Sequence, residues 1–98
     1  MLFAVIFQDA PDRLWVREHF LPAHVEWLAQ NADVIKVAGS LRSTSTAAPE
    51  GGLWIVEADS IEQIEALVAT DPFTVHGLRA GWSIRYWSKA FSDRYTSV

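Results

Sequence analysis

The sequence predicts an α+β fold with the element order βαββαβ. Three observations indicate it: four short runs rich in β-branched and aromatic residues, two segments between them with apolar residues at helical spacing, and a length of 98 residues, which allows a single core. We therefore expect one domain over residues 1–98, in which residues 92–98 form a polar C-terminal arm.

The four predicted strands are short apolar runs bounded by Gly, Pro, Asp or Ser, and they cover residues 2–8, 34–41, 53–58 and 82–91. Residues 42–52, between the second and the third, are rich in Ser, Thr, Pro and Gly. This composition is typical of the long tip of a hairpin.

The first helical segment contains Pro22, which cannot donate a hydrogen bond inside a helix. We therefore expect this segment to divide into a short helix over residues 12–19 and a main helix over residues 22–31. Pro22 would then occupy the first turn of the main helix, where a missing N–H group costs nothing.

The second helix begins with a capping-box pattern, Ser60 followed three residues later by Gln63. Apolar residues then recur at helical spacing through Thr70. The following Asp71-Pro72 pair predicts a short additional turn before the last strand.

This order of elements, with right-handed crossovers, predicts a four-stranded antiparallel sheet with both helices on one face, the ferredoxin-like arrangement. The first and third strands are apolar on both faces, whereas an antiparallel sheet with one wet face alternates apolar and polar residues. We therefore expect a second copy of the chain to cover the face without helices, as a homodimer. The alternative is that the loop or the C-terminal arm folds over this face.

Composition excludes several classes of function. A net charge of −4 with scattered basic residues argues against nucleic-acid binding. The absence of cysteine excludes disulfides, a thiol nucleophile and Cys-based metal sites, and it fits a reducing compartment. No apolar run is long enough to span a membrane, and the N-terminal run is too short for a signal peptide. We expect a cytoplasmic protein with no membrane contact, no metal and no cofactor.

One histidine and one aspartate are the candidates for chemistry. His24 begins an inward stripe on the first helix that continues with Trp27, Leu28 and Asn31, and Asp71 ends the equivalent stripe formed by Ile64, Leu67 and Val68. The two helices are antiparallel in this topology, so His24 and Asp71 can meet. A carboxylate that holds an imidazole in one tautomer beside a cavity is a general acid/base pair. The helix N-terminus at Pro22 would also favour the neutral imidazole.

Each of these residues also has a structural interpretation. Asp71 before Pro72 is a good N-cap for the turn that follows. His24 can be a hydrogen-bonded histidine of the core, and the five Trp residues can fill the core and the dimer interface.

The chain resembles the YCII family over essentially its whole length. The resemblance is carried by the order and spacing of four short motifs, which are Pro22-Ala23-His24 before a hydrophobic helix, Ala38-Gly39, Gly52, and Asp71-Pro72-Phe73. It implies a ferredoxin-like fold of the dimeric α/β-barrel kind, with His24 and Asp71 as the family's His–Asp pair. Related proteins act on small lactones of aromatic breakdown.

Four further residues are predicted to bind a small-molecule substrate. Arg17 matches a basic residue that relatives have upstream of the histidine, and Ser40 and Phe73 lie in or beside the matched motifs. His76 follows in the turn after Asp71 and can join the same cavity or remain an exposed loop histidine. Ser40 stands where many relatives have proline, so the resemblance specifies no substrate.

Three functions are compatible with these residues. The first is a cofactor-independent lyase, isomerase or hydrolase that uses His24 and Asp71 on lactones or aromatic-breakdown intermediates. The second is a cofactor-free monooxygenase of the same superfamily. The third is a non-catalytic module that binds a small molecule or assembles as a dimer, in which the pair is only structural.

Overall fold

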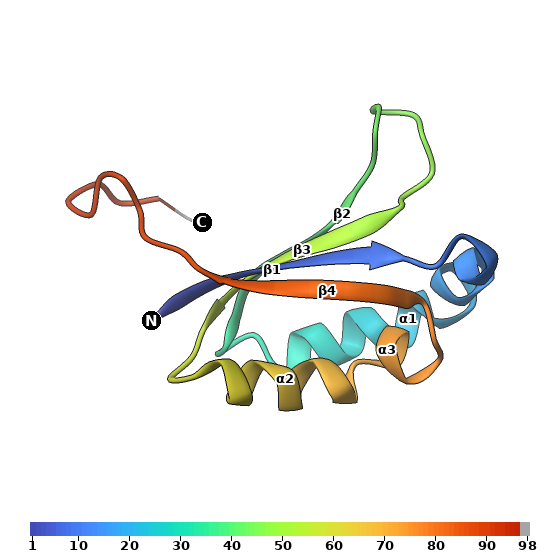
Figure 1. Ribbon diagram of the computed structural model, residues 1–98, viewed down its shortest axis with the longest axis horizontal. Coiled ribbons are helices and arrows are strands. Elements are labelled where there is room, and N and C mark those ends of the chain that lie inside the picture. Colours follow the sequence, from blue (N-terminus) through green and yellow to red (C-terminus); the bar gives the residue numbers. More distant parts are fainter. Residues whose placement is uncertain (97–98) are drawn as a thin grey trace.

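The computed structural model describes residues 1–96 and contains one sheet with the helices on one of its faces (Figure 1). The elements follow in the order β1 (Leu2–Asp9), the 3-10 turn η1 (Pro11–Arg13), α1 (Leu14–Gln30), β2 (Ile35–Leu41), β3 (Gly51–Glu57), α2 (Ile61–Thr70), α3 (Pro72–Val75) and β4 (Arg79–Tyr86). In this part of the chain, no helix is both long and apolar enough to cross a bilayer.

The sheet has the strand order β2-β3-β1-β4, and every neighbouring pair is antiparallel. The two central strands, β1 and β3, are also the most apolar, because both of their edges and one of their faces are buried. The order confirms the predicted α+β, ferredoxin-like fold.

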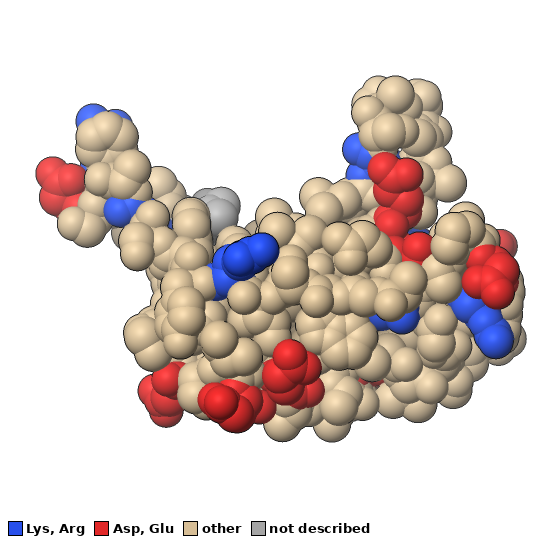
Figure 2. Space-filling view, viewed as in Figure 1, with Lys and Arg blue, Asp and Glu red and all other residues tan. Residues whose placement is uncertain are grey.

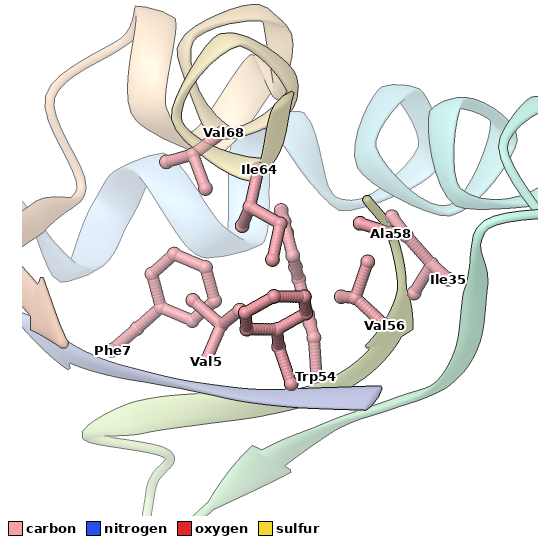
Figure 3. Packing of buried hydrophobic residues seen from close by; sticks show 9 residues of the cluster. Val5, Phe7, Ile35, Trp54, Val56, Ala58, Ile64 and Val68 are labelled. Carbon is pink, nitrogen blue, oxygen red and sulfur yellow. The ribbon is translucent and has the colours of Figure 1, made fainter. Parts of the chain in front are cut away.

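The core lies between the sheet and α2. Phe3, Val5 and Phe7 alternate along β1 and are at most 1% exposed, and Trp54 and Val56 of β3 lie beside them (Figure 3). The helix contributes its inward positions, including Ile64 and Val68. Each such side chain contributes roughly 1.5 to 3 kcal/mol when it is withdrawn from water, so this cluster is the main source of stability.

The opposite face of the sheet has no helix over it. Leu2, Ala4 and Ile6 of β1 point to this face, and their partners on β3 are Glu57, Ile55 and Leu53, respectively. Figure 1 shows loop 42–50 and the C-terminal residues 87–96 projecting from this side, and Figure 2 shows a hollow between them whose surface is mostly uncharged. We call this surface the open face.

The predicted division of the first helix at Pro22 is wrong. One helix, α1, runs without interruption from Leu14 to Gln30, with Pro22 in its interior. Buried side chains on both sides of the proline, Val16 and His24, anchor the two halves of the helix to the same neighbour, Phe73. Packing therefore outweighs the lost hydrogen bond, and His24 lies in mid-helix rather than near a positive N-terminus.

The predicted strand ends also need correction. β4 covers residues 79–86 rather than 82–91, because its length is set by pairing with β1, from Asp9 opposite Arg79 to Phe3 opposite Tyr86. β3 begins at Gly51 rather than residue 53. A side chain at Gly51 would collide with the backbone of Phe7, so the close strand pairing requires glycine there.

The second helix is capped as predicted. Gln63 N donates to Ser60 Oγ at 3.2 Å, and Gln63 Oε1 accepts from Asp59 N at 3.0 Å. The short turn after Asp71 is α3. The predicted arm over residues 92–98 is described as far as residue 96, is exposed and contains no helix or strand, while its last two residues lie outside the described residues.

Replacing Pro22 with alanine should stabilise the protein by about 1 to 3 kcal/mol, because the exposed helix interior regains an N–H donor and loses a steric conflict. Urea denaturation followed by circular dichroism measures the change. The matched variant Pro11→Ala, at the first residue of η1, should bring no comparable gain. An unchanged or lower stability of Pro22→Ala would show that the helix needs the proline.

Candidate active site

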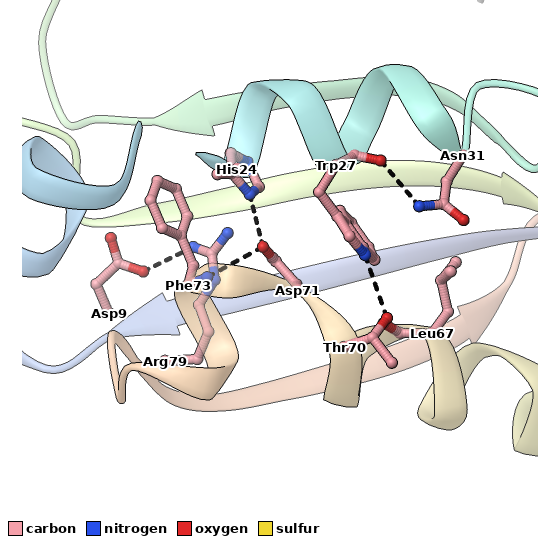
Figure 4. A network of polar contacts seen from close by, with 9 residues as sticks. All are labelled: Asp9, His24, Trp27, Asn31, Leu67, Thr70, Asp71, Phe73 and Arg79. Carbon is pink, nitrogen blue, oxygen red and sulfur yellow. Dashed lines mark hydrogen bonds and ion pairs between the residues drawn. The ribbon is translucent and has the colours of Figure 1, made fainter. Parts of the chain in front are cut away.

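His24 and Asp71 meet between α1 and the junction of α2 with α3. The Nδ1 atom of His24 lies 2.7 Å from Asp71 Oδ1, across 47 residues of sequence (Figure 4). The His24 side chain is 9% exposed and that of Asp71 is fully buried. Since a carboxylate accepts a hydrogen bond, Nδ1 carries the proton, and the lone pair of the neutral ring is on Nε2.

Asp71 also fulfils its structural interpretation as an N-cap. Its Oδ1 atom accepts the backbone N–H of Phe73 at 3.1 Å, which begins α3. The same oxygen therefore caps a helix and orients an imidazole. Within residues 1–96, Asp71 Oδ2 is buried and has no hydrogen-bond partner, so this carboxylate depends strongly on the two donors that it does have.

Phe73 supports the imidazole from behind. Its ring stacks on His24 with a centroid distance of 3.9 Å and an interplanar angle of 11°, and Phe73 is fully buried. The stacking and the bond to Asp71 together restrict both torsions of the histidine side chain. His24 is thus held in one orientation before any ligand arrives.

A second buried carboxylate, Asp9, binds two arginines. Its Oδ2 accepts from Arg17 Nη2 at 2.7 Å and its Oδ1 accepts from Arg79 Nη1 at 2.8 Å. The side chains are 0% exposed for Asp9, 15% for Arg17 and 2% for Arg79. Arg17 Nη2 also donates to the Gly51 carbonyl at 3.2 Å. This network ties α1 to the ends of β1, β3 and β4.

Arg79 is the most confined of these charges. Its guanidinium carbon lies 4.3 Å from the centre of the Phe7 ring, and the group rests against Gly52, which has no side chain to displace it. Burial lowers the pKa of Arg79 below its usual value, while the hydrogen bond and the charge of Asp9 oppose that shift. The guanidinium stays protonated, because arginine is not deprotonated in proteins.

A cavity of about 260 Å³ opens between α1 and the sheet, next to both groups. Its polar wall consists of Arg17, His24, Ser40 and Arg79, and its apolar wall includes Leu28 and Trp54. With Nδ1 bonded to Asp71, Nε2 is the ring nitrogen of His24 that is left for a ligand in this cavity. The arrangement can accept or return a proton at a ligand atom.

The structure brings together some of the predicted site residues and not others. Arg17, Ser40 and His24 line the cavity. Asp71 and Phe73 lie behind His24 and position it. The prediction that His76 joins the cavity is not supported by its position: it is exposed and stacks on Phe20 at 3.6 Å, away from the cavity wall.

Sequence reasoning missed Asp9 and Arg79. Counting back along β4 from Trp82 by alternation would turn Arg79 toward the open face. A register shift between Gln8 and Asp9 moves Arg79 opposite Asp9 instead and turns it to the helix side. One signal was available in the sequence: Asp9 ends an otherwise apolar strand. A carboxylate buried at that position requires a cation beside it.

Metal binding has no evident donor set. Within residues 1–96, no three His, Cys, Asp or Glu side chains gather at metal-binding distance. A hollow of about 290 Å³ beside α2 is lined mainly by apolar residues. Of its two polar members, Gln63 Oε1 accepts from Asp59 N at 3.0 Å and Thr70 Oγ1 accepts from Trp27 Nε1 at 3.2 Å, so this hollow offers no comparable chemistry.

This fold, with an imidazole beside a cavity between α1 and the sheet, places the protein in the class of small α+β proteins with a ferredoxin-like fold. Within that class the chain belongs to the YCII-related domain family, whose model matches residues 1–88. No curated protein matches the chain in sequence.

Several solved structures are similar. The 5-chloro-2-hydroxyhydroquinone dehydrochlorinase TftG from Burkholderia phenoliruptrix AC1100, in complex with 2,5-dihydroxybenzoquinone, has a TM-score of 0.81 and 32% identity, covering 90% of this chain and 94% of that chain. A putative antibiotic biosynthesis monooxygenase from Bacteriodes thetaiotaomicron VPI-5482 has a TM-score of 0.58 and 12% identity, covering 98% and 94%. Another antibiotic biosynthesis monooxygenase has a TM-score of 0.53 and 13% identity, covering 92% and 99%. The last two support the fold alone.

The Asp9 network should be essential to stability. Asp9→Asn removes the charge that compensates two confined guanidinium groups, and we expect a loss of about 3 kcal/mol or more in the free energy of unfolding. Urea denaturation measures it. Glu57→Gln breaks an ion pair to the N-terminus whose partners are 50% and 57% exposed, and it should cost at most about 1 kcal/mol. Equal effects of the two variants would contradict a structural role for Asp9.

Proposed function

We propose that the protein is a cofactor-independent enzyme that transfers protons at a small hydroxylated ring compound, with His24 as the general base and acid. The observation that carries the proposal is the 2.7 Å contact between His24 Nδ1 and Asp71 Oδ1 behind a cavity that His24 lines. Asp71 keeps the lone pair on Nε2, and it stabilises the imidazolium that forms when Nε2 takes a proton.

The reaction that we favour is a lyase-type elimination. Nε2 of His24 accepts a proton from one ring hydroxyl, and the imidazolium returns a proton to the adjacent ring carbon that bears the leaving group, which gives a C=O group and a tetrahedral carbon. Nε2 then accepts a proton from a second ring hydroxyl, whose O–H electrons form a second C=O group. The ring double bond moves to the tetrahedral carbon, and the leaving group departs from that carbon with its bonding pair as an anion. The imidazolium then releases the proton to water, so the sum is loss of an acid from the substrate. The ring supplies all the electrons, and no external oxidant is required.

Similarity to TftG supports this choice of reaction and of substrate. That protein is a dehydrochlorinase of a chlorinated hydroxyhydroquinone and is 32% identical over nearly the whole of both chains. The cavity here, about 260 Å³, is slightly smaller than the roughly 300 Å³ at which sites for drug-sized ligands begin, which suits a molecule of one ring.

Variants of the pair test the proposal with 5-chloro-2-hydroxyhydroquinone as substrate and chloride release as the readout. His24→Gln should lower kcat/KM by about 100-fold or more, the usual contribution of a general base. Asp71→Asn should also lower it, because an amide can donate to Nδ1 and stabilise the wrong tautomer. His19→Gln is the control, since His19 is exposed on the same helix and does not line the cavity.

Three outcomes would contradict the proposal. They are no chloride release by the wild-type protein, release by His24→Gln at the wild-type rate, and consumption of oxygen during turnover. The last would identify the reaction as a monooxygenation. Unfolding curves for each variant separate lost chemistry from lost folding.

We also propose that the protein is a homodimer in which two open faces pack together. The central strands present Leu2, Ala4, Ile6 and Leu53 on this face, beside the buried Ile55, and an apolar surface of this kind marks an interface. Phe91 and Tyr95 on the projecting C-terminal segment are 56% and 95% exposed, and a partner would give them apolar contacts. The site lies on the other side of the sheet, so dimerisation leaves it accessible.

A charge at the centre of the open face should prevent dimerisation. Leu53→Glu places a carboxylate on β3, the strand between β1 and β2, where the partner would remove it from water. We expect this variant to be a monomer by sedimentation velocity at micromolar concentration. Val75→Glu on α3, which is 62% exposed, should remain a dimer. A monomeric wild-type protein would overturn the claim, as would a dimeric Leu53→Glu variant.

A further inference from the structure

The charged groups around the cavity are arranged by sign. Both carboxylates of the site, Asp9 and Asp71, have side chains with no exposed surface, so neither faces a ligand. Arg17, Arg79 and His24 line the cavity in front of them. A molecule in the cavity therefore meets hydrogen-bond donors and positive charge. This holds although the formal charges of the two carboxylates and the two arginines sum to zero.

Each of the two arginines has N–H groups without a hydrogen-bond partner among the described residues. Asp9 occupies Nη1 of Arg79 and Nη2 of Arg17. Over residues 1–96, Arg79 Nη2 and Arg17 Nη1 have no hydrogen-bond partner, and the Nε atoms of both are buried without one. Arginine normally uses several of its five N–H groups when it is buried, so a guanidinium that is 2% exposed with one bond is incompletely satisfied.

This incomplete satisfaction has an electrostatic consequence. Burial destabilises the charged form of Arg79, which is the cause of its lowered pKa. An anionic oxygen beside Nη2 would stabilise that charge through a charge-assisted hydrogen bond to a guanidinium that is 2% exposed. An uncharged ligand would not.

We infer that the cavity selects ring compounds that carry an anionic oxygen, and that Arg79 is the residue that binds this oxygen. This inference rests on the proposed function and gives it a substrate class, the phenolates and enolates of small hydroxylated rings. Arg17 lies 15% exposed at the mouth of the same site and adds a second positive charge. His24 handles the proton, while Arg79 holds the oxygen.

A substitution at Gly52 can also displace the guanidinium of Arg79. A Cβ atom at Gly52 would lie 3.3 Å from Arg79 Nη1 and 3.4 Å from Nη2. These contacts are tighter than a methyl group normally makes, so Gly52→Ala should displace the guanidinium while keeping its charge in the protein. Arg79→Lys keeps a charge but loses the planar group.

The test compares two probes of nearly the same shape, 4-nitrophenol at a pH where it is fully ionised and its uncharged ether 4-nitroanisole. Titration calorimetry should show that the wild-type protein binds the phenolate at least tenfold more tightly than the ether. Arg79→Met should reduce this preference to near parity, and Gly52→Ala should reduce it at least threefold. Arg85→Met is the matched control, because Arg85 is exposed on the same strand.

The outcomes separate this inference from the proposed function. His24→Gln should keep the preference for the phenolate while losing turnover, because the probe is already ionised. Equal affinity of the wild-type protein for the two probes, or no detectable binding of the phenolate, overturns the inference. A full preference in both Arg79→Met and Gly52→Ala does so as well. If Arg79→Met does not fold, the affinities of Gly52→Ala and Arg79→Lys for the two probes test the inference. Turnover by His24→Gln tests the proposed function independently of these variants.

Discussion

Asp71 lies where α2 ends and α3 begins, next to α1, and one oxygen of its carboxylate contacts both α3 and α1. Oδ1 accepts the N–H that starts α3 and the proton on Nδ1 of His24. Since the side chain has no exposed surface, water cannot replace either donor. The same carboxylate therefore caps α3 and orients the imidazole, so the structural N-cap and the proposed acid/base partner are compatible interpretations of Asp71.

The second buried carboxylate, Asp9, imposes a similar constraint on the other side of the cavity. It needs cations, and the irregular register at the end of β1 brings Arg79 beside it while α1 brings Arg17. Two negative charges hidden behind three donor side chains leave a cavity whose lining favours anions, without any exposed cluster of positive charge. In the proposed reaction this arrangement separates two tasks, proton transfer at His24 and charge stabilisation at Arg79.

Much of the fold followed from local rules, and the misses have physical reasons. The capping pair Ser60 and Gln63 predicted the start of α2, and the stripe that ends at Asp71 predicted that this carboxylate faces inward. The predicted break at Pro22 was wrong because helix propensity describes only the local cost of proline. Val16 and His24 hold the helix together through tertiary packing. Arg79 was missed because a register shift at the start of β4 reverses which face of the sheet its side chain points to. No sequence pattern in the preceding residues predicts that shift. His76, which was included for its nearness in sequence to Asp71, follows α3 and is exposed, in line with the alternative of an exposed loop histidine.

The central claim is that Asp71 fixes the tautomer of His24, with the proton on Nδ1 and the lone pair on Nε2. Nitrogen-15 NMR of the histidine side chains reports this directly, because protonated and unprotonated ring nitrogens resonate at clearly different shifts. For the unliganded protein at a pH where the ring is neutral, the account predicts a protonated Nδ1 and an unprotonated Nε2 at His24, and a change in this distribution in Asp71→Asn. A proton on Nε2 of His24 in the wild-type protein would contradict it.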